Sequence, residues 1–316
     1  MAGTLNSPKS SVIITVFNEE NNIKKVISAL KNQTVQVREL IIVDGGSKDK
    51  TYEILQSEAK NWLELKVFQV PGNRSVGRNY GVSKSHFQIL AFTDAGCLPE
   101  KNWLYEITRP FSNPKTLVVS GYYRGEPKNT FQACLIPYVL VMPDRVDRNN
   151  FLPSTRSMAI RRSTWDNSGG FDPKLDHNED YAYAKWLEKM GIKFYFAPEA
   201  IVAWQPRKDL RQTAWMFTRF AIGDIQAGII RPKVKFLFIR YLVLIYLILI
   251  AVQIPILFAP LGVIILTYLI WSVSKNFRYV NNIGAVFWLP VLQITADLSV
   301  IFGTIVGFLA KAYGLL

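Results

Sequence analysis

Two long apolar segments restrict what this chain can fold into more than any other feature of its sequence. Residues 236–271 contain one charged side chain, Arg240, and residues 283–310 contain only Asp297. A helix that crosses the hydrocarbon core of a bilayer needs about 20 mostly apolar residues. The first segment is long enough for two such helices, and the second is long enough for one. The sequence therefore predicts a membrane protein.

Basic residues beside these segments predict how the helices are oriented. The three membrane-spanning helices are expected over 236–256, 258–274 and 284–310. Basic residues outnumber acidic ones in residues 206–240, and Lys275 and Arg278 follow the second helix. Loops rich in Lys and Arg stay on the cytoplasmic side of a membrane. The first two helices should therefore form a hairpin, and the third should leave the cytoplasm.

The remaining sequence predicts an α/β domain. Short β-branched runs at 11–17, 40–43, 65–70 and 88–93 alternate with helical patterns at 23–30 and 50–60. Strands that alternate with helices at these lengths form βαβ units and a mainly parallel sheet. We expect three parts: a catalytic domain over 1–205, an amphipathic basic linker of interfacial helices over 206–235, and an all-α transmembrane region over 236–316.

Composition excludes several classes of function. The formal net charge is +13, but the basic residues are not interleaved with aromatic ones and no nucleic-acid motif is present. Nucleic acid is therefore not an expected partner. The two cysteines, Cys97 and Cys134, have no metal-type spacing and predict a reducing compartment. The first eleven residues lack an apolar core, so no cleaved signal is expected and the catalytic domain should lie in the cytoplasm.

Acidic residues follow two of the predicted strands. Asp44 ends the strand at 40–43, and Asp94 ends the strand at 88–93. Ligands of open α/β sheets bind beyond the carboxyl ends of the strands. This placement predicts a nucleotide-binding enzyme joined to a membrane anchor.

Five motifs carry a resemblance to a known family. They occur in the order Val16-Phe17-Asn18-Glu19-Glu20, Val43-Asp44-Gly45-Gly46-Ser47-Lys48-Asp49-Lys50-Thr51, Gly77-Arg78-Asn79-Tyr80-Gly81, Thr93-Asp94-Ala95-Gly96 and Glu179-Asp180. Together they resemble the family 2 glycosyltransferases, which have the GT-A fold, here with carboxy-terminal transmembrane helices. The resemblance covers about residues 10–205. It implies the transfer of a sugar from a nucleotide-sugar donor, with UDP the commonest nucleotide, and inversion at the anomeric carbon.

The resemblance also assigns residues to the donor. Nucleoside contacts are expected from the loop that holds Phe17, Asn18 and Glu19, and from Asp44. Arg78 and Asn79 resemble an element beside the donor, where the guanidinium fork of Arg78 can offset diphosphate charge. Asp94 and Ala95 complete the expected donor-binding set: Phe17, Asn18, Glu19, Asp44, Arg78, Asn79, Asp94 and Ala95.

A divalent metal ion is the cofactor that the resemblance implies. Asp94 corresponds to the first acid of the family's D-x-D motif, but Gly96 stands where the second acid would be. Mg²⁺ and Mn²⁺ favour oxygen ligands and keep waters where protein ligands are few. Asp94 is therefore the one expected metal ligand, and binding should be weaker than at a site with two acids.

The pair Glu179-Asp180 is predicted to act on the acceptor. By resemblance Asp180 is the general base, with Glu179 beside it at the start of a helix. A hydroxyl group of a lipid-linked or membrane-associated acceptor would be the nucleophile. The alternative reading of the pair is that first-turn acids favour the helix dipole.

Three other functions fit parts of the sequence. In a polyprenyl-phosphate glycosyltransferase the acceptor is already an anion, and Arg156, Arg161 and Arg162 would serve on the acceptor side. A processive polysaccharide synthase would have a Q-x-x-R-W element, whereas Gln212 and Arg219 are wrongly spaced for one. A catalytically inactive membrane scaffold would explain the missing second acid at Gly96.

Overall fold

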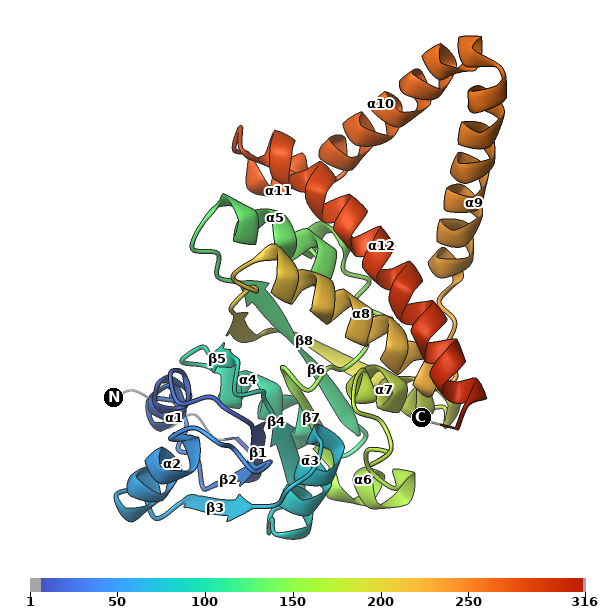
Figure 1. The fold of residues 1–316 in the computed structure, drawn as a ribbon. Helices are drawn as coiled ribbons and strands as arrows, with labels where there is room; N and C mark the ends of the chain where they lie inside the picture. The colour runs from blue at the N-terminus through green and yellow to red at the C-terminus, as the bar shows by residue number, and fades with distance from the viewer. Residues whose placement is uncertain (1–6, 315–316) are drawn as a thin grey trace. The chain divides into compact units, whose positions relative to one another are not determined.

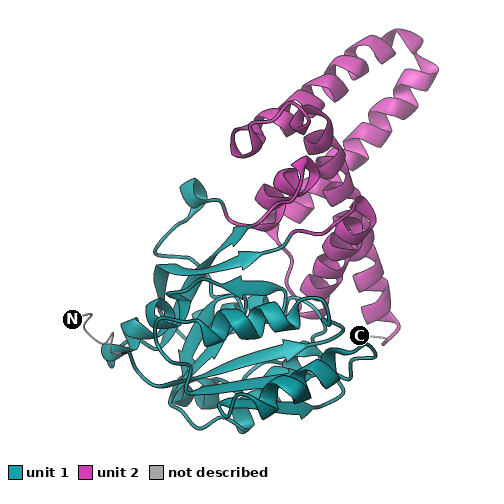
Figure 2. Cartoon of the chain, turned by 90° about the vertical axis from the view of Figure 1, so that its left-hand side faces the viewer, with its two compact units in different colours: residues 1–125, 142–205 teal, residues 126–141, 206–316 magenta. Residues whose placement is uncertain are grey.

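A computed structural model describes residues 7–314 of the chain. These residues form two compact units, which we describe separately (Figure 2). Residues 1–125 and 142–205 belong to the first, here called the catalytic unit. Residues 126–141 and 206–316 belong to the second, the helical unit.

An eight-stranded mixed sheet forms the centre of the catalytic unit, and the four neighbouring strands β3, β2, β1 and β4 in it are parallel (Figure 1). Its strands lie in the order β3-β2-β1-β4-β7-β6-β8-β5. The strands span β1 Ser10–Val16, β2 Glu39–Asp44, β3 Leu65–Gln69, β4 Ile89–Phe92, β5 Cys97–Pro99, β6 Val118–Gly125, β7 Met158–Arg161 and β8 Phe194–Trp204. The pairs β1–β2, β1–β4, β2–β3 and β6–β8 are parallel, whereas β7 runs antiparallel to both β4 and β6. This is the mainly parallel sheet that the strand–helix alternation predicts.

Helices connect and cover these strands. They are α1 Ile23–Lys31, α2 Thr51–Lys60, α3 Arg74–Ser83, α4 Trp103–Thr108, α6 Arg162–Ser168 and α7 Glu179–Lys189. α3 packs closely on the sheet because two of its residues are glycines. A Cβ atom at Gly77 would lie 2.7 Å from Thr15 Cγ2, and one at Gly81 would lie 2.8 Å from Ile13 Cγ2. This close approach brings the Arg78 side chain into the interior.

The hydrophobic core lies between the sheet and α3, α6 and α7. Strand residues such as Ile13, Leu90 and Ile160 are buried there together with the aromatic rings of Phe92, Trp165, Phe171 and Tyr183. Phe92 stacks on Trp165 with 5.4 Å between ring centroids, and Phe171 meets both rings edge-on. Burial of such rings is the main favourable contribution to folding. The segments on either side of this core carry the polar residues described below.

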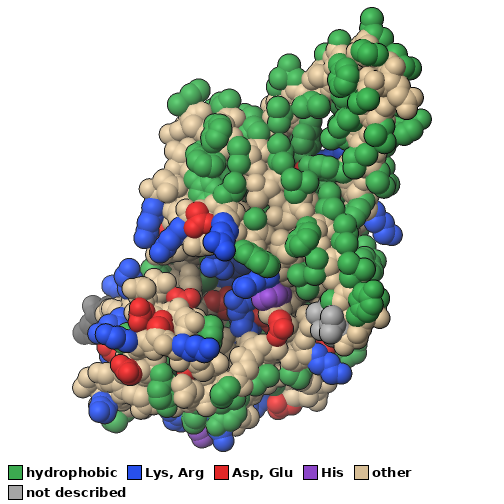
Figure 3. Space-filling model, viewed as in Figure 1, with side chains coloured by type: hydrophobic (Ala, Val, Ile, Leu, Met, Phe, Trp, Pro, Cys, Tyr) green, Lys and Arg blue, Asp and Glu red, His purple; other side chains and the backbone are tan. Residues whose placement is uncertain are grey.

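The helical unit contains the apolar segments. Its longer helices are α5 Thr130–Val139, α8 Leu210–Gln226, α9 Pro232–Gln253, α10 Phe258–Ser274 and α12 Ala285–Ala312, with the short α11 Phe277–Val280 before α12. Three stretches are long and apolar enough to cross a membrane: Pro232–Gln253, Pro255–Val280 and Ala285–Ala312. α9 and α10 form a helical hairpin whose side chains are mainly hydrophobic (Figures 1 and 3).

α12 differs from the hairpin helices because other helices cover part of it. It packs along α8, where a Cβ atom at Gly303 would lie 2.4 Å from the Thr218 carbonyl oxygen. On α5, the Tyr138 hydroxyl donates to the Leu289 carbonyl at 2.9 Å, and Phe131 meets Trp288 edge-on. The region expected to hold interfacial helices thus supplies α8, whose buried face lies against α12. Trp215 of α8 stays exposed, with the Arg219 guanidinium 5.7 Å from its ring centroid.

Candidate active site

Three neighbouring parallel strands end at the same edge of the sheet. Val16 pairs with Asp44, and Ile13 pairs with Phe92, so β1, β2 and β4 reach this edge together. The loop after β1 holds Phe17 to Glu19, the loop after β2 begins at Asp44, and Asp94 follows β4. Residues separated in sequence by many positions therefore meet where an α/β sheet binds its ligands.

Arg78 lies at the centre of a buried network of charges. Its Nη1 donates to Glu179 Oε1 at 2.6 Å, and its Nη2 donates to Asp94 Oδ1 at 2.8 Å and to Thr155 Oγ1 at 3.0 Å. The Arg78 side chain is 2% exposed, and its guanidinium carbon lies 5.4 Å from the ring centroid of Phe171. The family resemblance predicts that this fork offsets the charge of the donor diphosphate. The structure instead uses it within the protein, because both terminal nitrogens already have acceptors.

These contacts shift the pKa values of their members. Burial alone would lower the pKa of Arg78, but the carboxylates of Asp94, Glu179 and Asp180 raise it above its ordinary value. Burial would raise the pKa of Asp94, but the positive charges of Arg78, Arg156 and Arg74 lower it. Both groups are therefore charged over the whole physiological pH range.

The two adjacent acids at the start of α7 have different surroundings. Glu179 is buried, 4% exposed, and is ion-paired with Arg78. Asp180 is half-buried; its Oδ2 accepts from Ser154 Oγ at 2.7 Å, and its Oδ1 accepts from the backbone N–H of Tyr181 at 2.8 Å. Consecutive helical residues point about 100° apart, which separates the two side chains. Of the two side chains, only that of Asp180 is partly exposed.

Arg156 lies beside Asp180, in the turn before β7. Its guanidinium carbon is 5.4 Å from the ring centroid of Tyr123, a residue that is 8% exposed. Burial would lower the pKa of Arg156, but nearby Asp180 and, more weakly, Asp94 raise it. Arg156 therefore carries its charge within a partly enclosed site.

Asp44 is fully buried, and protein donors already surround its carboxylate. Its oxygens accept from the backbone N–H groups of Gly46 and Ser47, from the Ser47 hydroxyl and from Gln69 Nε2. The side chain therefore shapes the loop after β2, which differs from the expected direct contact with a nucleoside. A structural aspartate and a ligand-binding aspartate look alike in the sequence, because both follow the strand directly.

The loop after β1 is held to the loop after β2. Asn18 has a positive φ of 54°, and its side-chain oxygen accepts from the Lys48 backbone N–H at 2.9 Å. The Asn18 N–H donates to Ser47 Oγ at 2.8 Å, and the Glu19 N–H donates to Thr51 Oγ1 at 2.7 Å. The Phe17 ring is left 55% exposed at this edge.

Asn79 and Ala95 do not present free groups to a donor. The Asn79 amide donates to the Phe171 carbonyl at 2.7 Å and accepts from the Phe171 N–H at 3.1 Å, so both of its polar atoms hold the turn at Gly169–Phe171. Ala95 is buried, with 5% exposure. Asn79 thus fixes the position of this turn through both of its polar atoms.

Arg161 and Arg162 lie at the opposite edge of the sheet from the acids. β7 runs antiparallel to β4, so Arg161 pairs with Ile89 at the start of β4 while Met158 pairs with Phe92 near Asp94. Arg161 donates to the carbonyls of Thr116, Phe111 and Asn113. These two side chains therefore lie away from Asp180 and donate mainly to backbone carbonyls, whereas Arg156, at the other end of the strand, lies near Asp180.

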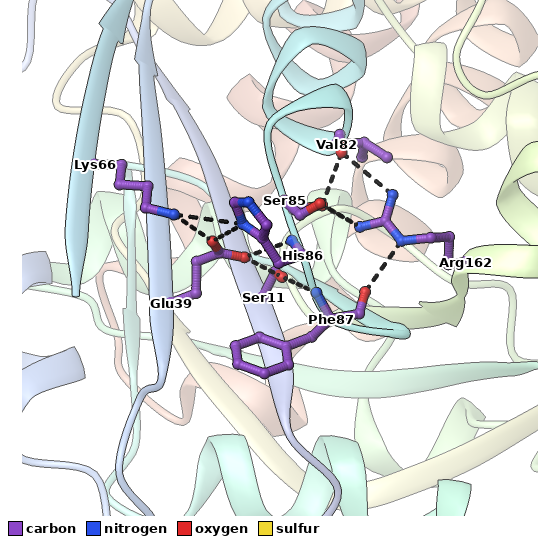
Figure 4. A network of polar contacts seen from close by, with 8 residues as sticks. All are labelled: Ser11, Glu39, Lys66, Val82, Ser85, His86, Phe87 and Arg162. Atoms are coloured by element: carbon purple, nitrogen blue, oxygen red, sulfur yellow. Dashed lines mark hydrogen bonds and ion pairs between the residues drawn. The ribbon is translucent and has the colours of Figure 1, made fainter.

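A second polar network surrounds Arg162 at this opposite edge. Figure 4 shows the Arg162 guanidinium directed at the Phe87 and Val82 carbonyls and at Ser85, beside a cluster around Glu39. Glu39 is buried and accepts from Ser11 Oγ at 2.6 Å, Lys66 Nζ at 2.8 Å and the His86 N–H at 2.9 Å. These contacts join the starts of β1, β2 and β3, which makes this network structural.

Three residues of the site were not anticipated from the sequence. Ser154 contacts Asp180, Thr155 contacts Arg78, and Tyr123 lies under Arg156. The sequence feature that could have indicated them is the polar run Ser154-Thr155-Arg156 directly before a buried strand. This run lies near Asp94 only because β7 runs antiparallel to β4.

The metal that the resemblance implies can be compared with the oxygen atoms present. Asp94 is 33% exposed, and the hydrogen bonds recorded for residues 7–314 engage only its Oδ1. Within the same residues, no group of three or more His, Cys, Asp or Glu side chains could hold a metal ion. The donor set therefore fits an ion that takes one protein oxygen from Asp94 and the rest from substrate and water.

Comparison with known proteins now decides the family. A model of glycosyl transferase family 2 matches residues 11–170, about half of the chain. This protein belongs to glycosyltransferase family 2. The matched residues include every predicted donor-side residue, whereas Glu179 and Asp180 lie beyond the matched range.

Individual family members resemble longer parts of the chain. The Haloferax volcanii protein named glycosyltransferase AglE is 28% identical over 239 residues, covering 72% of this chain and 75% of its own length. The Salmonella typhimurium O-antigen chain rhamnosyltransferase RfbN is 25% identical over 232 residues, covering 65% of this chain and 70% of its own. Together with the family model, these relatives show that the chain is a glycosyltransferase.

A solved structure shows the fold. The mannosyltransferase PcManGT from Pyrobaculum calidifontis, in complex with GDP-Man and Mn²⁺, has a TM-score of 0.60 at 18% identity. The match covers 94% of this chain and 88% of that one. The predicted GT-A fold followed by helices that could span a membrane is therefore confirmed.

Proposed function

We propose that this glycosyltransferase is anchored in a membrane, inverts the configuration of the sugar, and transfers it from a nucleotide sugar to a hydroxyl group of a lipid-linked or membrane-associated acceptor. The observation that carries the proposal is the different pairing of two adjacent acids. Glu179 is buried against Arg78, whereas Asp180 is half-buried and keeps acceptor capacity beyond Ser154 Oγ. A general base must reach the proton that it removes. We therefore assign this step to Asp180.

In the proposed reaction the acceptor oxygen attacks the anomeric carbon from the face opposite the leaving group. The new carbon–oxygen bond forms as the bond from the anomeric carbon to the phosphate oxygen breaks. The acceptor proton passes to the Asp180 carboxylate, and the nucleoside diphosphate leaves with the electron pair. Because attack and departure take place on opposite faces, the configuration is inverted.

The donor would lie across the ends of β1, β2 and β4. The exposed Phe17 ring, beside the Asn18–Glu19 turn, is available to a base or ribose. Mg²⁺ or Mn²⁺ held by Asp94 would neutralise the negative charge of the diphosphate, and the PcManGT complex supports this assignment because it contains Mn²⁺ with its nucleotide sugar. UDP-sugars should be tested first and GDP-sugars second.

The helical unit supports the acceptor class and location. Three helices long and apolar enough to cross a membrane follow the catalytic unit in the same chain. Arg231 lies directly before the first of them, and Lys233 and Lys235 lie in its first turn; such residues favour the cytoplasmic side. A cytoplasmic catalytic unit tied to the bilayer would meet acceptors carried on lipids. RfbN, named for the O-antigen chain, makes a glycan acceptor a reasonable first choice.

The proposal is tested with the full-length protein in detergent. Hydrolysis of UDP-, GDP- and dTDP-sugars is measured first, and transfer to lipid extracts is then measured with the active donor. Asp180→Asn should lower transfer about 10²- to 10⁴-fold, the usual contribution of a general base, with little change in nucleotide affinity. Asp166→Asn, an exposed acid on α6, is the matched control. Near-normal turnover by Asp180→Asn would refute the assignment and favour an acceptor that is already an anion.

A further inference from the structure

The arginines of the catalytic unit differ in how many of their donors the protein uses. Both terminal nitrogens of Arg78 donate hydrogen bonds, to Glu179, Asp94 and Thr155. Arg161 and Arg162 each make three or more hydrogen bonds, mainly to backbone carbonyls. Within residues 7–314, the Arg156 side chain makes one hydrogen bond, from Nη1 to Ser154 Oγ at 3.3 Å. Since a guanidinium has five N–H donors, most of those of Arg156 are unused.

The position of the Arg156 guanidinium is nevertheless well defined. It lies over the ring of Tyr123, which is buried, and Ser154 holds one end of it. Stacking on an aromatic ring fixes the plane of a guanidinium and leaves its edge free for hydrogen bonds. The arrangement is therefore preorganised for a planar or forked ligand.

A purely structural role, the neutralisation of nearby acids, accounts poorly for this geometry. Asp94 already has a direct ion pair with Arg78 at 2.8 Å, and Asp180 accepts from Ser154 at 2.7 Å. Among the described side chains no ion pair joins Arg156 directly to either carboxylate; the three groups interact at longer range. A charged group with unused donors in a partly enclosed site favours binding of an anion.

We propose that Arg156 recognises a phosphate group of a substrate, which is the role that the sequence predicts for Arg78. The inference rests on the proposed function and deepens it. The guanidinium fork matches two phosphate oxygens, and Arg156 lies near both Asp94, on the donor side, and Asp180, on the acceptor side. The phosphate can belong to the donor diphosphate or to a lipid phosphate of the acceptor.

Calorimetry on the full-length protein in detergent distinguishes these sources. The ligands are UDP, uridine, inorganic pyrophosphate and a short-chain polyprenyl phosphate, titrated into the wild type, Arg156→Gln and Arg156→Lys. If the phosphate is the donor's, Arg156→Gln weakens binding of UDP and pyrophosphate about tenfold or more and leaves uridine unchanged. If it is the acceptor's, only binding of the polyprenyl phosphate weakens. Arg156→Lys keeps the charge but not the fork and should lose part of the affinity.

The control is Arg109→Gln, an arginine that is 52% exposed and paired with Glu106 at 3.2 Å. Thermal unfolding of each variant shows whether it is folded. The inference is overturned if Arg156→Gln and Arg156→Lys bind UDP, pyrophosphate and polyprenyl phosphate as the control does. A wild type that binds no nucleotide would instead refute the proposed function. In that case the inference about Arg156 is tested with pyrophosphate and polyprenyl phosphate alone. If the wild type binds neither of these two ligands, the inference is overturned as well.

Discussion

An arginine–carboxylate cluster around Arg78 in the catalytic unit and one around Asp297 in the helical unit are built in opposite ways. In the catalytic unit the arginine is central: the Arg78 side chain is 2% exposed and donates hydrogen bonds to two carboxylates and a hydroxyl. In the helical unit the acid is central. Asp297 of α12 accepts from Arg240 Nη2 at 2.6 Å, Tyr241 at 3.1 Å, Gln293 at 3.0 Å and the Tyr268 hydroxyl.

The difference follows from what surrounds each cluster. Arg78 lies against Phe171 in a packed core, and the core holds it in place whether or not a ligand is bound. Asp297 instead joins α9, α10 and α12, whose large apolar side chains mostly point outward. Apolar contacts give little driving force for helix association in lipid, so hydrogen bonds and close packing hold membrane helices together. The first cluster therefore organises a site, and the second connects helices.

The largest effect is expected from Arg78→Met. Removing one partner of a buried ion pair leaves an uncompensated charge, here Glu179 at 4% exposure, and costs about 3–5 kcal/mol. The free energy of unfolding of the catalytic unit should fall by that amount, and transfer should be lost with it. Thermal and denaturant unfolding in detergent measure the change, with Arg109→Met as the exposed control. A loss below about 1 kcal/mol would show that the core does not depend on this cluster.

A second, intermediate effect is expected at the other edge of the same sheet. Burial would raise the pKa of Glu39, but hydrogen bonds from Lys66, Ser11 and His86 lower it from 4.5 to about 2. Because the folded pKa is depressed, this stabilisation is complete above pH 4.5 and is lost as the pH falls toward 2. Glu39→Gln should therefore cost about 2–3 kcal/mol at pH 7.

The pH dependence provides the check on Glu39. Unfolding of the wild type and of Glu39→Gln is compared between pH 7 and pH 3, and the difference between them should shrink below pH 4.5. Because this cluster lies at the far edge from Asp94 and Asp180, donor binding at pH 7 should not change. A difference in stability that is constant with pH would mean that the Glu39 charge contributes nothing.

The smallest effect is expected in the helical unit. Asp297→Asn removes the charge but keeps a hydrogen-bond acceptor, and the Arg240 side chain, 38% exposed, can move toward the bilayer surface. Hydrogen bonds between membrane helices contribute about 0.6–2 kcal/mol, so the loss should lie in that range. Limited proteolysis and thermal unfolding in detergent measure it, and hydrolysis of the donor should be retained.

A double variant sharpens the comparison between the clusters. Replacing both members of a buried ion pair by apolar residues is often nearly neutral, so Arg240→Leu with Asp297→Leu should recover most of the stability lost in Asp297→Asn. Arg78→Met with Glu179→Met should recover less, because the charged Asp94 loses its partner there, whereas the groups that lose Asp297 in the helical unit (Tyr241, Tyr268 and Gln293) are uncharged. Equal recovery in the two units would remove the distinction between them.

The sequence by itself determined the fold class and the parts of the chain. Alternating strand and helix patterns predicted the sheet, and two apolar stretches predicted three membrane helices, because burial and membrane insertion depend on the local run of apolar residues. It also predicted that Asp44 and Asp94 would lie at one edge of the sheet, because parallel neighbouring strands end there together. Such properties follow from local composition and order.

Tertiary structure alone decided which charges are available to a substrate. Arg78 and Arg156 are both basic residues in short, mostly polar runs of the sequence, but the glycines of α3 let Arg78 reach the core, while Arg156 stays in a turn at the rim. The antiparallel direction of β7 puts Arg161 and Arg162 at the far edge. The rotation of about 100° between consecutive helical residues directs Glu179 to Arg78 and leaves Asp180 half-buried beside Ser154. Pairing depends on contacts between residues far apart in the chain, which a local pattern does not contain.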